Sequence, residues 1–181
     1  MRRWVGVLVA TGLLVAAAVI IEAPAGAVAA GGTSCKSGGG AAAFTPALPI
    51  FASSAKVKAV LKSSGTVAGC SGAVKSGKIT GVSARSAGSN CTTLTTRTTT
   101  ATKVALTVTW NTGATSTIAA QLKEIPNVAV TTQTVSGPVK AGLFKGSKLS
   151  GKFTYTLPKG ACVKTPLAKL TYADVGAVVI K

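Results

Sequence analysis

The sequence predicts an all-β domain, either an antiparallel β-sandwich that is immunoglobulin-like in the broad sense or a squat barrel, behind an N-terminal signal helix. Beyond residue 30 no segment keeps a helical period, whereas apolar and polar residues alternate from end to end. Connections rich in glycine, proline and threonine divide this alternation into about eight or nine short strands. The cysteines and the tryptophan lack the spacing of a true immunoglobulin domain, so the strand topology stays open.

Residues 1–30 have the layout of a secretory signal peptide. Two arginines precede an uncharged apolar run, and small residues follow it as far as Ala30. We place the cleavage site near Ala29 or Ala30, which leaves residues 31–181 as a single secreted β domain. An uncleaved anchor is the alternative, because the apolar run is at the lower limit of length for spanning a bilayer.

Residues 31–43 form a loose, glycine-rich entry that is expected to end as an edge strand through Phe44. The segment A-K-V-K-A-V-L-K, residues 55–62, then alternates as a half-buried strand with its lysines outward. Further strands are expected where glycine and serine recur, since glycine commonly marks a bend or bulge in a strand. A polar connection over residues 88–102 follows, in which Asn90 could cap a single turn.

The clearest strand signals lie in the second half of the chain. Residues 104–110 place every second side chain on one apolar face, and Asn111-Thr112-Gly113 then supplies a turn into a return strand. Residues 148–157 alternate without exception. The side chains expected in the core from these segments are Val104, Leu106, Val108, Trp110, Phe153 and Tyr155.

Two further extended runs complete the predicted sheet. Residues 128–139 form one of them. The other is the C-terminal run V-G-A-V-V-I, whose Val175, Ala177 and Val179 are expected to form a last strand.

Four cysteines lie beyond the predicted signal, and an even number in an exported chain predicts two disulfides with three possible pairings. We prefer Cys35 with Cys70 and Cys91 with Cys162. The first pair is equidistant from the P-A-L-P-I-F segment, as the open ends of an antiparallel hairpin would be. With neither a C-x-x-C motif nor a histidine, no metal site is expected.

The ionisable residues exclude most catalytic chemistry. General acid–base catalysis normally uses histidine or a pair of carboxylates, and beyond the signal the chain has no histidine and only Glu124 and Asp174. We expect Glu124 at the rim of a sheet and Asp174 in a turn after Tyr172. Neither Walker nor Rossmann glycine patterns occur, and the G-G-G tract is expected to serve turns and flexibility. The sequence therefore predicts no catalytic residue and no cofactor.

Charge provides the main functional hint. The chain has 20 basic and 3 acidic residues, for a net charge of +17, and loss of Arg2, Arg3 and Glu22 with the signal would leave +16. Such a charge favours solubility and salt-sensitive adhesion to polyanions. No acid occurs between residues 140 and 169, and the candidate polyanion contacts there are Lys140, Lys145, Lys148 and Lys152. Alternatively, these lysines only maintain solubility and protect strand edges.

Three roles follow in order of preference. The first is a non-catalytic structural or interaction role outside the cell or at its envelope. The second is capture of an anionic cell-wall polymer or another polyanion. The third is carbohydrate binding, which requires aromatic rings exposed to solvent. The sequence names no partner, and we expect a monomer that neither reads nucleic-acid sequence nor contacts membrane after signal cleavage.

Several short motifs together resemble a known group of proteins. They are S-G-x-x-x-G-C around Cys70, N-C-x-x-L at residues 90–94 and T-W-N-x-G-x-x-S at residues 109–116. With the export signal and four cysteines, they are similar to small secreted proteins of actinobacteria whose role is uncharacterised. The resemblance implies a disulfide-bonded β-sandwich outside the cytoplasm and supplies no ligand or catalytic residue.

We predict that Trp110→Ala lowers the free energy of unfolding by about 3 to 5 kcal/mol, because a large core side chain leaves a cavity when it is truncated. Urea denaturation followed by circular dichroism measures this loss. A Trp110→Ala variant of unchanged stability that had lost only a ligand would instead place Trp110 in a binding site.

Overall fold

The computed structural model describes residues 31–50, 58–84, 90–91, 101–124 and 131–181. The predicted signal helix, residues 1–30, lies outside the described residues and stays a prediction. Within the described part of the chain, no helix is long and apolar enough to cross a membrane.

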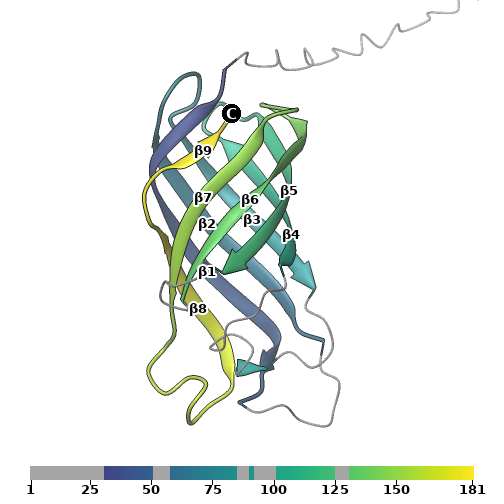
Figure 1. Ribbon diagram of the computed structural model, residues 1–181, viewed down its shortest axis with the longest axis vertical. Helices are drawn as coiled ribbons and strands as arrows, with labels where there is room; N and C mark the ends of the chain where they lie inside the picture. Colours follow the sequence, from purple (N-terminus) through teal and green to yellow (C-terminus); the bar gives the residue numbers. More distant parts are fainter. Residues whose placement is uncertain (1–30, 51–57, 85–89, 92–100, 125–130) are drawn as a thin grey trace, which may run out of the picture.

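The described residues form one antiparallel sheet that closes into a barrel (Figure 1). Its strands are β1 (Thr33–Leu48), β2 (Val60–Cys70), β3 (Ser76–Ala84), β4 (Thr102–Trp110), β5 (Thr115–Glu124), β6 (Thr132–Gly142), β7 (Lys148–Thr156), β8 (Leu167–Asp174) and β9 (Val178–Ile180). Each strand from β1 to β7 pairs with the next one in the sequence, and β1 also pairs with β8 and β9. This last pairing closes the wall.

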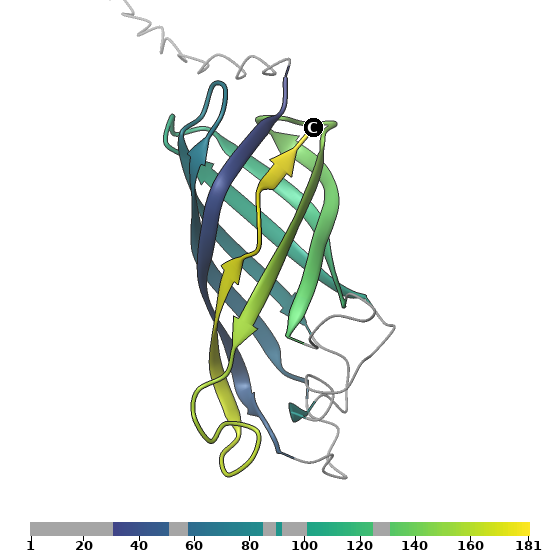
Figure 2. The same cartoon turned by 60° about the vertical axis from the view of Figure 1, so that its left-hand side comes forward.

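Strands β8 and β9 share a single position in the wall. Both pair with β1 on one side and with β7 on the other, at different heights of the barrel. Figure 2 shows them following one another between these two neighbours. The barrel therefore has eight strand positions, a size whose interior is filled by side chains or holds one small ligand.

The all-β, antiparallel prediction is confirmed, and the barrel is the alternative that forms. An immunoglobulin-like sandwich needs two packed sheets and connections that cross between them. Here the strands from β1 to β8 pair with their sequence neighbours, so a single sheet returns to its own first strand instead of dividing into two.

Two predicted elements are only partly correct, one at each end of the described chain, although the last strand forms as β9. The expected loose entry and edge strand is the 16-residue strand β1, which is paired along both sides. In the C-terminal run, Val178 and Ile180 turn inward, whereas Val175 is 50% exposed. Val178 and Ile180 continue the alternation of Tyr172 and Asp174 on β8, so the even-numbered residues of this run face the interior instead of the expected odd-numbered ones.

The chain forms the two predicted disulfides, in the preferred pairing. Cys35 and Cys70 face each other across β1 and β2, and Cys91 is joined to Cys162 in the connection between β7 and β8. The bridges join residues that are 35 and 71 positions apart. Loops of this length imply a stabilisation of about 4 kcal/mol for each bridge on the chain-entropy estimate.

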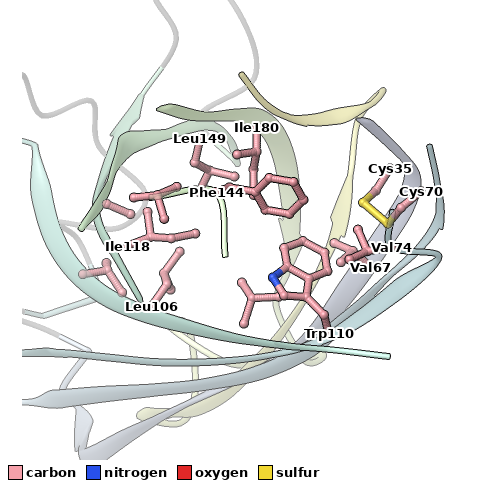
Figure 3. Packing of buried hydrophobic residues seen from close by; sticks show 14 residues of the cluster. Cys35, Val67, Cys70, Val74, Leu106, Trp110, Ile118, Phe144, Leu149 and Ile180 are labelled. Atoms are coloured by element: carbon pink, nitrogen blue, oxygen red, sulfur yellow. A yellow bond between two sulfur atoms is a disulfide. The ribbon is translucent and has the colours of Figure 1, made fainter. Parts of the chain in front are cut away.

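The buried side chains form two clusters, one toward each end of the barrel. The short turns after β2, β4 and β6 define what we call the hairpin end. The cluster toward this end includes Trp110, Phe144 and the Cys35–Cys70 bridge (Figure 3). The cluster toward the opposite end includes Phe44, Leu48, Cys91, Tyr155 and Leu167.

Trp110 and Phe144 plug the hairpin end. Their ring centroids are 5.5 Å apart in an edge-to-face arrangement, and their side chains are 3% and 2% exposed. Trp110 Nε1 donates a hydrogen bond of 2.8 Å to Ser116 Oγ, which in turn donates to the Leu143 carbonyl. Phe144 has a positive φ of 63°, which costs a non-glycine residue energy that its burial offsets.

We predict that Ser116→Ala lowers the free energy of unfolding by about 1 to 3 kcal/mol, because it leaves the Trp110 N–H and the Leu143 carbonyl without their buried partner. Thr117→Ala, at the exposed neighbouring position of β5, is the matched control and should change stability little. Equal losses in urea denaturation of the two variants would contradict the role assigned to Ser116.

Candidate functional site

A cavity of about 130 Å³ lies inside the barrel and is lined by side chains from both clusters. For comparison, an engineered apolar cavity of about 150 Å³ holds a benzene molecule. Alternation places every second residue of each strand in this interior. Most of the lining is aliphatic or aromatic, and its side chains with a hydroxyl, amide or carboxyl group are Thr33, Ser63, Gln133, Tyr155, Tyr172 and Asp174.

The register of three neighbouring strands places the polar groups in a row. Gln133 of β6 pairs with Phe153 of β7, and Phe153 pairs with Asp174 of β8. All three side chains line the cavity. Since neighbouring strands are about 4.8 Å apart, the backbones of Gln133 and Asp174 are separated by about 10 Å, with Phe153 between them.

Asp174 is therefore not the turn residue that we expected. It is the last residue of β8, and it turns inward in alternation with Leu170 and Tyr172. This alternation is visible in the segment L-T-Y-A-D, which is the signal that could have placed it. An aspartate after a tyrosine fits a turn equally well by composition, so its pairing with β7 was needed to decide.

Three glycines make room for Tyr172 and Asp174. The Tyr172 hydroxyl crosses β1 and donates a hydrogen bond of 3.3 Å to the Ser64 carbonyl of β2. A Cβ atom at Gly40 or Gly65 would lie 2.8 or 2.5 Å from that hydroxyl, and one at Gly38 would collide with Asp174 Oδ2. The G-G-G tract, expected to serve turns and flexibility, instead lies within β1 beneath these two side chains.

The Asp174 carboxyl group has no partner in the described part of the chain, where it makes neither a hydrogen bond nor an ion pair. Burial raises its pKa to about 6. Burial also raises the pKa of Tyr172, and the negative charge of Asp174 adds to that shift. The Phe153 ring lies beside Tyr172, with centroids 5.9 Å apart and an interplanar angle of 68°.

The six expected core residues all face the barrel interior. Five of them are buried, and Phe153 is half-buried where it lines the cavity. The other described aromatic residues, Phe44, Phe144 and Tyr172, are also buried or line the cavity. None of the described aromatic rings thus forms the exposed platform that a carbohydrate-binding surface would need.

The candidate polyanion contacts are exposed and lie close together in sequence around the hairpin of β6 and β7. Lys140 is on β6, Lys145 is in the turn, and Lys148 and Lys152 are on β7. Each of the remaining strands from β1 to β8 also carries an exposed lysine. These are Lys36, Lys62, Lys78, Lys103, Lys123 and Lys169. The described lysines are therefore spread around the outer wall of the barrel.

The described residues contain no group of three potential ligands that could hold a metal ion. Glu124 is the last residue of β5, and its side chain lies outside the description. Comparison with known proteins finds no match to a family model, to a curated protein or to a solved structure. The resemblance to secreted actinobacterial proteins thus stays a prediction.

We predict that Asp174 makes the protein less stable as the pH rises. Its pKa is about 6 in the folded protein, against an ordinary value of 3.8, because burial favours the protonated carboxyl group. Its contribution to the free energy of unfolding is therefore complete below about pH 4 and is lost as the pH rises through 6. Raising the pH from about 4 to 7 should therefore lower the unfolding free energy of the native protein relative to Asp174→Asn. Parallel stability profiles for the two proteins in urea denaturation would contradict this assignment.

Proposed function

We propose that this protein is an exported, non-catalytic binding protein whose barrel holds one small, mainly apolar molecule. The observation that carries the proposal is the cavity of about 130 Å³ between the two clusters. Tight packing leaves few voids in a protein interior, and a barrel of this size either fills its interior with side chains or keeps space for a ligand. The apolar lining favours a ligand that gains by leaving water.

Two features support export. Disulfides persist in oxidising compartments outside the cytoplasm, and the chain has two of them. Residues 1–30 have the composition of a signal peptide, whose cleavage would release the barrel into the medium or the cell envelope. We propose this location together with the binding role.

The chemistry of the cavity supports binding without catalysis. Its ionisable lining groups among the described residues are Asp174, Tyr155 and Tyr172, and the chain contains no histidine. Acid–base catalysis usually needs histidine or a second carboxyl group at hydrogen-bond distance from the reacting atoms. A single carboxyl group in an apolar cavity is better suited to orienting a ligand than to transforming it.

The distribution of the lysines supports a binding site inside the barrel over one on its outer wall. Because they surround the barrel, they favour solubility and discourage association of one wall with another. A single basic face would have favoured a polyanion partner, and the described lysines do not form one. Binding inside the barrel is therefore the interaction that we propose, in place of electrostatic capture on its outer wall.

We predict that toluene binds with one molecule per chain and that Ile79→Trp weakens this binding about tenfold or more, because the larger ring occupies cavity space. Isothermal titration calorimetry measures the affinity, and a negative heat-capacity change should accompany apolar burial. Thr80→Trp is the matched control, because Thr80 is the exposed neighbour on β3.

No detectable toluene binding to the native protein would refute the proposed cavity function. Equal weakening in the folded Ile79→Trp and Thr80→Trp proteins would show that toluene binds elsewhere. Circular dichroism checks that both variants retain the β-sheet spectrum.

A further inference from the structure

We infer that the molecule held in the barrel carries a protonated amine on an apolar body, and that Asp174 receives this amine. The inference rests on the proposed function, since it names the chemical class of the ligand in the same cavity. Asp174 lines the cavity and has no hydrogen bond or ion pair with any described residue. Partly buried charged groups are normally paired, because removing them from water without a partner is costly.

The described residues that face Asp174 provide no positive charge, so a cation that pairs with its carboxylate has to come from a bound molecule. On β1 the residue that faces Asp174 is Gly38, and on β7 the residue paired with Asp174 is Phe153. On its own strand the inward neighbour is Tyr172, which is the titratable group beside it. Lys36 and Lys152, the nearby lysines of β1 and β7, are exposed. No cation of the described residues reaches Asp174 from inside the barrel.

The groups around Asp174 suit an ammonium ion in particular. Phe153 and Tyr172 place two aromatic rings beside the carboxyl group, and aromatic faces attract ammonium ions. Gln133 lies beyond Phe153 in the same row and offers an amide oxygen as a further acceptor. A carboxylate, two rings and an amide therefore lie along one part of the cavity wall.

The rest of the cavity limits the body of the ligand. Aliphatic residues of β3, β4 and β5 line it opposite this row, including Ile79, Leu106 and Ile118. A volume of about 130 Å³ is close to that of a cavity that holds benzene. A single ring with an aminomethyl group, as in benzylamine, combines the expected body with the expected charge.

The net charge of the protein sharpens the test. At +17, the chain repels a cation at long range. A preference for an ammonium ligand over a neutral one of the same size must therefore arise from a local partner. Work at about 0.15 M salt limits the long-range repulsion, because the screening length is then about 8 Å.

The experiment compares benzylamine with benzyl alcohol, which has a similar size but no charge, by calorimetric titration of the full chain and of Asp174→Asn. We expect benzylamine to bind the native protein about tenfold more tightly than benzyl alcohol, as a charge-assisted hydrogen bond implies. Asp174→Asn should abolish this preference, and detectable binding of benzyl alcohol to the variant shows that it is folded.

A second measurement needs no variant. At about pH 5 the Asp174 carboxyl group is mostly protonated, so binding of benzylammonium should release a proton and its heat should depend on the buffer. Its affinity should rise between pH 5 and 7. Benzyl alcohol should show neither effect.

The outcomes separate this inference from the proposed function. If toluene binds but benzylamine is not preferred over benzyl alcohol, or the preference survives in Asp174→Asn, the amine inference is wrong and the apolar binding role stands. Benzylamine binding without proton release at pH 5 also overturns the inference. If toluene and both benzyl compounds fail to bind, the proposed function itself is wrong.

Discussion

Closure of the sheet is the constraint on which the rest of the structure depends. Strand β1 pairs with β2 on one side and with β8 and β9 on the other, and this removes the exposed edges that an open sheet would have. Closure also separates an inside from an outside for every strand at once. Lysines on one face of a strand must then lie in solvent, and apolar side chains on the other must share a single interior.

Closure of the sheet also explains why the pKa of Asp174 is raised. On an open sheet, Asp174 at the end of β8 would face solvent or a turn. In the barrel it faces an apolar interior that Trp110 and Phe144 plug at the hairpin end, and burial raises its pKa. The glycines of β1 hold Tyr172 and Asp174 close to the wall, so the polar groups lie beside the cavity without filling it.

Local pattern was enough to predict part of this arrangement. The strand from Val104 to Trp110, its turn and its return strand follow from alternation and turn residues alone, which are properties of adjacent positions. Strand β1 was missed as a paired strand because its small residues carry little apolar signal. The inward residues of β9 were missed because Asp174 was taken for a turn residue, so the alternation of β8 was not continued into the C-terminal run. The cavity was also missed, since its lining comes from every part of the wall.

The sequence by itself determined an all-β chain, the inward face of its clearest strands, two disulfides and a surface dominated by positive charge. These follow from residue types and short-range spacing. Only the tertiary structure decided that the sheet closes into a barrel and that Gln133, Phe153 and Asp174 form one row across three strands. Register between strands depends on hydrogen bonds between residues far apart in the chain, and no local pattern specifies which residues those are.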